Sequence, residues 1–378
     1  MGVMILKGQA RFFNDGLILD SAVNYDLFKR ITENLDEMYG ENPDPAIEKR
    51  VRDEWVWMQQ EDMFFTICQL DELTRTLDDF DIPYSIRYSG NASFILYLLG
   101  ITNINPLPPH YHCHHCHSVI WDCNAKCGVD LEKEKHCEKD GTIMRANGFN
   151  IPWQAHFLHK QEHDFHISII PDMYEETLDV LYTIGMDDFR NHPNYRTNKH
   201  RVIETNNIIL HFNLPELCLD PPTINASNSE TLVELARQYA FKTTPDLNVR
   251  ITTFADVVSY IGILRSDYTN DEKLKVLINI FHYKPSELIT CREDLYQYYV
   301  DHGCTERMAF KLMSNVRKGK HFLNNFPSQE MRTAKDKWVM SFCEDVRYLP
   351  IKTDIVEDLF FNLACRTNVS PFESLITN

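Results

Sequence analysis

Residues 108–142 have the sequence PPHYHCHHCHSVIWDCNAKCGVDLEKEKHCEKDGT, which holds five of the chain's eleven cysteines and six of its sixteen histidines. The stretch belongs to a longer segment, 103–152, that is rich in Pro, Cys, His and Gly and has few apolar runs. A segment of this composition cannot form a core of its own, so it needs a staple such as a bound metal ion. The fold of this part of the chain therefore depends on what its cysteines bind.

The spacing of these cysteines predicts a metal site. Cys113 and Cys116 are separated by two residues, which places two thiolates on one tight turn and is a usual half-site for tetrahedral zinc. Clustered cysteines in an intracellular chain bind metal more often than they form disulfides. Thiolate ligands in a segment without a core indicate a structural zinc site, because catalytic zinc keeps an open position in a pocket. The alternative is a loop of free, reduced cysteines.

Spacing alone leaves the second half of this site open. A second pair of ligands should follow the first by about ten to twenty residues. The candidates are Cys123, Cys127 and Cys137, with Asp140 nearby. The histidines around them are His112, His114, His115, His117 and His136. Most of these histidines are expected to be surplus to the site and solvated.

Composition predicts an intracellular, cytoplasmic protein with no membrane partner. The chain has 378 residues, 43% of them hydrophobic, which is enough for a buried core and about two or three domains. The first residues, MGVMILKGQARFF, lack the apolar core of a cleavable signal, and no apolar run approaches the roughly 18 residues of a membrane span. The net charge of -17 disfavours a dedicated nucleic-acid binder, although NYRTNKHR (194–201) and NVRKGKHF (315–322) are local basic runs.

The hydrophobic pattern changes along the chain. Residues 24–80 have apolar positions at three- and four-residue spacing and are predicted to be mostly helical. DFHISII (164–170) and NNIILHF (206–212) are predicted strands, with a predicted helix at 173–185 between them. From residue 229 the pattern is helical to the end. The sequence thus predicts a mixed α/β first part and an all-helical second part.

Seven stretches carry a resemblance to one known family. They are YGENPDPAIEKRVRDEW (39–55), ITNINPLPPHYHCHHC (101–116), CGVDL (127–131), HCEKDGT (136–142), NGFNIPWQAHFL (147–158), TFADVVSYIGIL (253–264) and CREDLYQYYVDHGCTERMAFKLMSNVRKGK (291–320). In family order, they resemble parts of the PolC-type bacterial DNA polymerase III alpha subunit, the C-family replicase. The resemblance covers the palm, the zinc loop and part of the fingers, as expected of a short, diverged relative.

The resemblance implies an α+β fold. Its parts are a nucleotidyltransferase-type palm with a zinc-binding loop insertion, followed by an all-helical fingers-like region. The implied division is a helical lead-in with the start of the palm at 1–102, the zinc-binding loop at 103–152, the palm sheet region at 153–228 and the fingers-like region at 229–378.

The resemblance also assigns the zinc positions. Three of them fall on Cys113, Cys116 and Cys137. The family's fourth cysteine is replaced here by Asp140. Asp140 is therefore expected either to ligate the zinc itself or to give way to another cysteine of the loop, Cys127 or Cys123.

The polymerase chemistry of the family depends on carboxylates around two metal ions, which activate the attacking 3′-hydroxyl and neutralise the departing pyrophosphate. HDFHISI (163–169) matches the strand with the first two acids, where Asp164 keeps the first position and His166 replaces the second. LCLDPPT (217–223) matches the third acid, at Asp220. Mg²⁺ requires oxygen ligands, whereas an imidazole favours softer ions such as zinc or manganese. The alternative is that Asp164 and Asp220 are relic or surface carboxylates.

Two other stretches match the family's phosphate contacts. SIRYSGNASF (85–94) matches a Gly/Ser loop whose backbone amides and hydroxyls receive the triphosphate, although Tyr88 and Asn91 replace small residues. The residues of this loop that persist are Arg87, Ser89, Gly90 and Ser93. VRKGK (316–320) is intact, and its cations either contact phosphates or form the solvated end of a helix. These cations are Arg317, Lys318 and Lys320.

These matches predict a pseudo-polymerase, a diverged PolC-like palm and fingers protein that is catalytically impaired. Its expected partners are DNA, a deoxynucleotide (dNTP) or replisome proteins. The alternative is an active DNA-directed DNA polymerase with an altered metal site, in which Asp164 and Asp220 act with His166 or Glu216 and with Mg²⁺ or Mn²⁺. A third interpretation is a structural adaptor held together by zinc.

Overall fold

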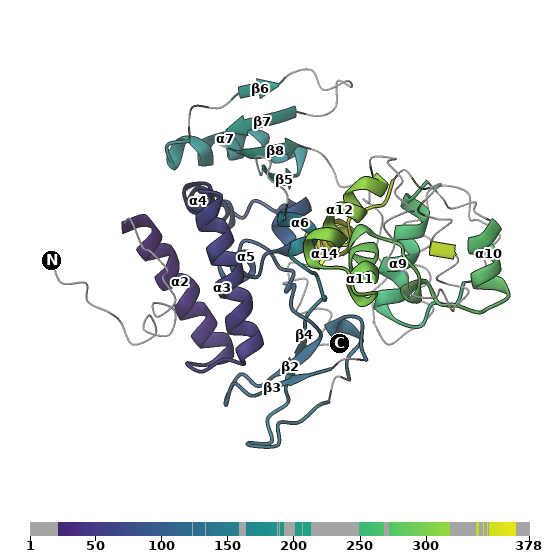
Figure 1. Cartoon of the computed structure of the whole chain (residues 1–378). Coiled ribbons are helices and arrows are strands. Elements are labelled where there is room, and N and C mark those ends of the chain that lie inside the picture. The colour runs from purple at the N-terminus through teal and green to yellow at the C-terminus, as the bar shows by residue number, and fades with distance from the viewer. Residues whose placement is uncertain are drawn as a thin grey trace. The chain divides into compact units, whose positions relative to one another are not determined.

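The structure is a computed structural model of the whole chain (Figure 1). It describes residues 22–122, 124–132, 134–158, 164–186, 188, 190–192, 201–205, 207–212, 249–267, 272–317, 338–339, 343, 346 and 348–367. Contacts within the chain define two compact units. Unit 1 comprises 1–123, 131–149 and 161–216, and unit 2 comprises 124–130, 150–160 and 217–378.

Three helices open the described part of unit 1. They are α2 (Ala22–Tyr39), α3 (Pro45–Gln60) and α4 (Phe64–Asp79). α3 begins with a proline after Asp44, whose carboxylate accepts a hydrogen bond from the Ala46 amide at 2.9 Å, as a good N-cap does. The apolar positions at three- and four-residue spacing, such as Leu27, Ile31 and Leu35, are buried. These helices agree with the helical pattern of residues 24–80.

A five-stranded sheet with the strand order β1-β5-β8-β7-β6 forms the second part of unit 1. The strands are β1 (Tyr84–Arg87), β5 (Phe165–Ile169), β6 (Arg190–His192), β7 (Arg201–Thr205) and β8 (Ile208–Phe212). β5 and β8 are parallel, and all other neighbouring pairs are antiparallel. η3 (Pro171–Met173) and α7 (Tyr174–Thr183) follow β5 in the chain. The central strands β5 and β8 confirm the two predicted strands, whereas β1, β6 and β7 are additional.

The alternation of side chains along the strands gives this sheet one apolar face. Ile167 of β5 pairs with Leu210 of β8, and both side chains are fully buried. Phe212, two residues further along β8, packs against the ring of Tyr174 in α7 with 4.8 Å between the ring centroids. The opposite face carries polar side chains, which are described below as part of the candidate site.

A smaller sheet follows in the segment rich in cysteine. It consists of β2 (His110–His112), β3 (Val119–Trp121) and β4 (Arg145–Asn147), in the order β3-β2-β4, with both pairs antiparallel. Between β1 and this sheet the chain forms η1 (Tyr88–Ala92) and the short helix α5 (Phe94–Leu98). Immediately after β4, the Phe149 amide donates a hydrogen bond to the Asn105 carbonyl at 2.9 Å, so the chain segments on either side of the small sheet lie together.

Unit 2 is helical over its described residues. Its elements are η2 (Gly128–Asp130), α6 (Gln154–Phe157), α9 (Phe254–Arg265), α10 (Glu272–Asn279), η4 (Pro285–Glu287), α11 (Arg292–Asp301), α12 (Glu306–Arg317) and α14 (Lys352–Thr367). α9 starts with a capping box of Thr253 and Asp256. Apolar side chains of α10, α11 and α12, among them Leu277, Leu295 and Leu312, form one buried core cluster.

The described elements form a mixed α and β structure that is compatible with the predicted α+β fold. The identification of a palm and a zinc loop, and the division into four segments, stay predictions. Across the described part of the chain, every helix is too short or too polar to traverse a lipid bilayer.

Gly148 generates a first prediction. It has a φ of +99°, and an added Cβ would lie 2.7 Å from the Leu107 carbonyl oxygen and closer still to that of Pro108. We expect Gly148→Ala to reduce the free energy of unfolding by more than about 2 kcal/mol, because backbone strain and a backbone clash add together. Denaturant titration of the purified variant measures this loss.

Gly100 offers the matched control. Its φ is +77°, but an added Cβ would have nothing within 4 Å. Gly100→Ala therefore isolates the strain and should cost about 1–2 kcal/mol. Equal losses in the two variants would contradict the close approach of the Gly148 backbone to the 107–108 segment.

Candidate functional site

Four side chains around the small sheet form a group that could hold a metal ion. One ligand atom from each of Cys113, Cys116, Cys137 and Asp140 lies within 4.8 Å of the others. The Sγ atoms of Cys116 and Cys137 are 3.4 Å apart, as are Cys113 Sγ and Asp140 Oδ2. Ligand atoms of a tetrahedral zinc ion with Zn–S distances of about 2.3 Å are roughly 3.5–3.8 Å apart. The group therefore fits a four-coordinate ion with little movement.

Two turns of the same construction present these four side chains. In the first turn the Cys113 amide donates to the Ser118 carbonyl at 2.9 Å, and in the second the Cys137 amide donates to the Thr142 carbonyl at 2.8 Å. Asp140 stands in the second turn where a cysteine stands in the first, three residues after the leading cysteine. The geometry thus brings Asp140, and not another cysteine, to the fourth position of the group.

Hydrogen bonds set the protonation of these groups. The Thr142 amide, which donates to Asp140 Oδ1 at 2.9 Å, holds the pKa of this carboxyl well below its usual value. Hydrogen bonding to Ser118 lowers the pKa of the Cys116 thiol, whereas burial raises the pKa of Cys113. Asp140 is therefore a carboxylate at neutral pH, ready to act as an oxygen ligand.

The other candidates for this site are engaged elsewhere or lie outside the description. Cys127 is buried, and its thiol donates to Asp130 Oδ2 at 3.2 Å. Cys123 lies outside the described residues. The expectation that surplus histidines are solvated is wrong for His112, which is 5% exposed because it belongs to the central strand of the small sheet. His114 and His115 are exposed, as expected.

The polar face of the five-stranded sheet carries a pair of histidines. In the strand register, Arg87 of β1 lies opposite His166 of β5, and Ser168 of β5 lies opposite His211 of β8. His166 Nδ1 is 2.8 Å from His211 Nε2, a hydrogen-bonding distance, and the two ring planes differ by 12°. Burial lowers the pKa of His166, which favours its neutral form.

This pair does not fit a magnesium ion. Mg²⁺ takes oxygen ligands in near-octahedral geometry, and the two central strands present imidazole nitrogens to each other instead. Asp164 is exposed and directly precedes β5. Asp220 and Glu216 lie outside the described residues, so their positions relative to the pair stay predictions.

The loop that matches the family's triphosphate-binding loop is tightly built. Tyr88 has a φ of +57°, a left-handed conformation that glycine adopts without strain, and its ring packs perpendicular to that of His166 with 4.8 Å between centroids. An added Cβ at Gly90 would lie 2.6 Å from Ile86 Cγ2, so any larger residue there requires the buried Ile86 side chain to move. Asn91 is fully buried and donates to the Ile86 carbonyl at 2.5 Å. Asn91 therefore braces the loop from inside.

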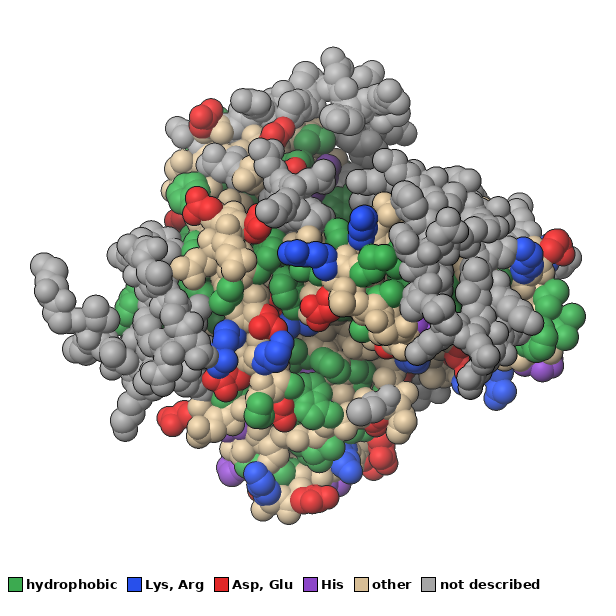
Figure 2. All heavy atoms as spheres, in the orientation of Figure 1, with side chains coloured by type: hydrophobic (Ala, Val, Ile, Leu, Met, Phe, Trp, Pro, Cys, Tyr) green, Lys and Arg blue, Asp and Glu red, His purple; other side chains and the backbone are tan. Residues whose placement is uncertain are grey.

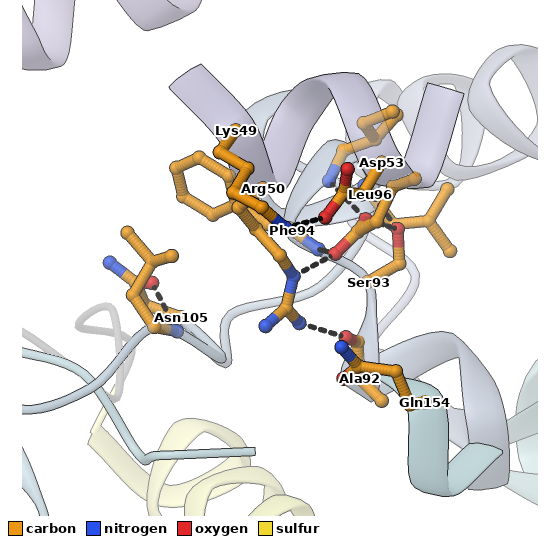
Figure 3. A network of polar contacts seen from close by, with 12 residues as sticks. Lys49, Arg50, Asp53, Ala92, Ser93, Phe94, Leu96, Asn105 and Gln154 are labelled. Atoms are coloured by element: carbon orange, nitrogen blue, oxygen red, sulfur yellow. Dashed lines mark hydrogen bonds and ion pairs between the residues drawn. The ribbon is translucent and has the colours of Figure 1, made fainter. Parts of the chain in front are cut away.

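A buried carboxylate bonds to the end of this loop, and Figure 3 shows Ser93 and Phe94 of this loop end near Arg50 of α3. Glu54 of α3 accepts hydrogen bonds from Ser93 Oγ at 2.8 Å and from the amides of Phe94 and Ile95 at 3.0 and 3.1 Å. Arg50 forms an ion pair with Glu54 and donates to the Ala92 carbonyl at 2.8 Å. Glu54 and Ser93 are at most 1% exposed. The first amides of α5 are thus already bonded to an internal anion.

The remaining predicted phosphate contacts are only partly covered by the described residues. Arg87 is half-buried, and its Nε donates to Ser168 Oγ at 3.0 Å. Ser89 is half-buried within η1. Arg317 ends α12, with its side chain outside the description, and Lys318 and Lys320 lie beyond the described residues.

Sequence reasoning missed two residues of this site. Both histidines lie on predicted strands, His166 in 164–170 and His211 in 206–212. They meet only because β5 and β8 pair in a parallel register. Glu54 follows Arg50 at a helical spacing of four, which is typical of an exposed ion pair rather than a buried one. In contrast, the sequence does point to Asp140. CHHCHS (113–118) and CEKDGT (137–142) can be aligned position by position, and Asp140 then stands where the first stretch has Cys116.

Comparison with known proteins finds no matching family model. The chain is 21% identical to DNA polymerase III PolC-type of Thermotoga maritima over 435 aligned residues, which cover 83% of this chain and 31% of that protein. It is 35% identical to the Caldanaerobacter subterraneus protein of the same name over 132 residues, 34% of this chain and 9% of the relative. Over 71 residues it is 44% identical to the Streptococcus suis protein, covering 18% of this chain and 5% of the relative.

These partial matches establish a distant similarity to PolC-type DNA polymerase III. The chain spans about a third or less of the length of the curated relatives it matches.

The buried carboxylate generates the second prediction. We expect Glu54→Gln to lower the free energy of unfolding by roughly 3–5 kcal/mol, because it removes the buried ion pair with Arg50 and turns an amide toward the donors of Ser93 and Phe94. Denaturant titration measures the loss.

Asp53 on the same helix provides the control for Glu54. Its carboxylate is 34% exposed and pairs with Lys49, which is 72% exposed. Asp53→Asn removes the same charge, and we expect a change within about 0.5 kcal/mol. Similar effects of the two substitutions would show that the Glu54 network contributes little.

Proposed function

We propose that the chain is a diverged PolC-like palm-and-fingers protein that is impaired in nucleotidyl transfer and binds DNA, a deoxynucleotide or replisome proteins. The distant similarity to PolC-type DNA polymerase III supports a polymerase-related role. The observation that carries the rest of the proposal is the hydrogen-bonded pair of His166 and His211 on the polar face of the sheet.

Nucleotidyl transfer by two metal ions needs carboxylates that hold both ions against the reacting oxygens. Here His166 stands at the position of the family's second acid, and its ring nitrogen is bonded to His211. A neutral imidazole in this place removes one negative charge and an oxygen ligand for Mg²⁺. Asp164 and Asp220 are the acids left for the reaction, and we expect them to bind Mg²⁺ too weakly for efficient transfer.

The loop at 85–94 supports the same proposal. In the family this loop receives the triphosphate, but here the amides of Phe94 and Ile95 and the hydroxyl of Ser93 donate to Glu54. Phosphate binding at those donors would require displacing a buried, paired carboxylate, which is costly. Arg87 and Ser89, which are half-buried, are then the loop residues on which we place a contact with nucleotide.

We place the contact with DNA on the basic segment that contains Arg317, Lys318 and Lys320. The chain as a whole is acidic, with a net charge of -17. On the face drawn in Figure 2, basic and acidic side chains are interspersed among the described residues rather than gathered in one basic patch. Binding is therefore expected to be local to a few phosphates and to weaken steeply with salt.

We further propose that Cys113, Cys116, Cys137 and Asp140 bind one structural zinc ion. The fit of the four ligand atoms supports this assignment. When bound, the ion would tie the two turns together and supply the staple that the segment 103–152 requires. His115 Nδ1, 3.3 Å from Asp140 Oδ2, is placed to orient that carboxylate from outside the metal.

The second candidate function is an active polymerase with an altered metal site. Asp164 and His166 keep the two-residue spacing that puts both side chains on one face of a strand. In this proposal Mn²⁺ replaces Mg²⁺, with Asp220 or Glu216 as a further ligand.

Primer extension tests the two functions against each other. With a primed template and all four deoxynucleotides, we expect no extension in Mg²⁺ or Mn²⁺, while fluorescence anisotropy detects DNA binding that falls linearly on a log–log plot against salt. Salt-insensitive or absent DNA binding would favour the structural adaptor instead.

Variants of the two acids decide the origin of any activity. Extension by the purified chain that disappears in Asp164→Asn and Asp220→Asn, but persists in Asp179→Asn, would refute the impaired polymerase. Asp179 is the matched control because it is an exposed aspartate on α7, a helix with no predicted metal ligand.

Zinc content is the last prediction from this proposal. Elemental analysis should find about one equivalent of zinc per chain, and chelation should lower the unfolding temperature because the segment loses its staple. We expect Asp140→Ala to weaken zinc binding by more than the roughly 10–100-fold that loss of an outer-shell partner costs. Asp140→Cys should retain the ion.

The control for the zinc site is Cys304→Ser, a half-buried cysteine of unit 2 that lies outside the metal group. Its zinc content should equal that of the parent chain. A metal-free preparation that unfolds at the same temperature as the zinc-loaded protein would exclude a structural role for the ion.

A further inference from the structure

Tyr88 differs in type from the other residues that have a left-handed backbone. The described residues other than glycine with a positive φ are Asp62, Asp81, Tyr88, His117, Asn150, Asn207 and His282. Aspartate, asparagine and histidine are several-fold enriched in this conformation, whereas a bulky side chain there is an outlier. Of these described residues, Tyr88 is thus the one whose residue type does not explain its backbone.

Much of Tyr88 stays at the surface in spite of this strain. Its ring is perpendicular to that of His166, with 4.8 Å between centroids, yet the residue is 43% exposed. Asn91, the other residue that replaces a small one in this loop, is fully buried and bonded to the Ile86 carbonyl. Asn91 therefore has a structural role, whereas at Tyr88 the chain keeps an exposed aromatic ring on a strained backbone. Strain of this kind is typical of functional positions.

The charges around the ring favour a ligand with few phosphates. Arg87 directly precedes Tyr88, lies half-buried opposite His166 in the strand register and adds one cation. Asp164, exposed and two residues before His166 in the chain, adds one anion. The donors at the far end of the loop are bonded to Glu54. One nucleotide of a strand brings a single negative charge to this place, whereas a triphosphate brings several and needs more donors.

An exposed aromatic ring beside a cation suits an unpaired nucleobase. Stacking on an aromatic side chain accepts any base, because every base has a π-face, and a neighbouring cation contacts the strand's phosphate. In a duplex the bases already stack on one another, so their faces are covered. The ring of Tyr88 therefore fits a base of a single strand better than one within a duplex.

We propose that Tyr88 is a stacking platform for an unpaired nucleobase of single-stranded DNA, with Arg87 beside it for the adjoining phosphate. The inference rests on the proposed function and deepens it, because it names the part of the DNA that the loop at 85–94 receives. A free deoxynucleotide offers the same base, and the experiment below separates the two sources.

Binding of a short, labelled oligothymidylate to the full chain tests the platform. Tyr88→Gly removes the ring and suits the left-handed backbone, so we expect affinity to fall at least about fivefold. Because the strain is relieved, the unfolding temperature should rise or stay within about 2 °C of the parent value. Tyr88→Phe keeps the ring and should bind within about twofold of the parent chain. Tyr182→Ala is the matched control, at a 59% exposed tyrosine on α7, and should bind like the parent.

An abasic strand shows whether the ring contacts a base. The parent chain should bind the abasic strand more weakly than oligothymidylate, and Tyr88→Gly should bind the abasic strand as well as the parent does. The slope of log affinity against log salt should be equal in both proteins, because the ring makes no phosphate contact. A Tyr88→Gly loss that is the same for both strands, or a reduced salt slope, overturns the proposal.

Competition identifies the source of the base. Thymidine triphosphate should displace the labelled strand only far above the Kd of the strand. Displacement near that Kd, lost in Tyr88→Gly, overturns single-stranded DNA as the ligand in favour of the nucleotide. Equal strand binding by the parent and Tyr88→Gly overturns the platform and leaves the proposed function standing. If the parent binds neither strand nor nucleotide, both the platform and the DNA-binding part of the proposed function are overturned.

A measurement on the unmodified chain keeps the test independent of variant folding. A strand that carries 5-iododeoxyuridine should crosslink on irradiation to the peptide that contains Tyr88, as mass spectrometry of a digest would show. Crosslinking confined to other peptides overturns the platform.

Discussion

The buried carboxylate of Glu54 is the interaction on which the arrangement of unit 1 depends. A charge that is 1% exposed must be paired and hydrogen-bonded, and this carboxylate has an arginine, a hydroxyl and two backbone amides as partners. These partners tie α3 to the first turn of α5. β1 and η1 directly precede α5 in the chain, and the end of α5 leads into the segment with the metal group.

The same interaction explains how the loop can resemble a phosphate-binding loop and still be closed. Small residues and free amides make an anion site only where the amides face solvent or ligand. In this chain a side-chain anion from a neighbouring helix accepts hydrogen bonds from the amides at the end of the loop, and Asn91 fills the loop from inside. The polar groups of the loop are therefore satisfied without a bound anion.

Much of the fold was predictable from the sequence because it rests on local patterns. The helices of residues 24–80 and the central strands β5 and β8 follow hydrophobic periodicity. The four residues of β1 are too few for a periodic signal, and they form a strand only by pairing with β5. The contact of His166 with His211 depends on a register between strands 45 residues apart, and the burial of Glu54 depends on a helix packed across the chain. Such tertiary pairings leave no local trace.

The cysteine group and the histidine pair differ in how their polar groups are satisfied. Three thiols and a carboxylate lie within 4.8 Å of one another, and a bound metal ion would tie them together and add order to the segment that carries them. Clustered carboxylates on the polar sheet face would repel one another without metal. A hydrogen-bonded pair of imidazoles satisfies itself, and the sheet keeps its geometry whether or not an ion is present. The order of this face therefore does not depend on a metal ion, in contrast to the dependence that we propose for the cysteine segment.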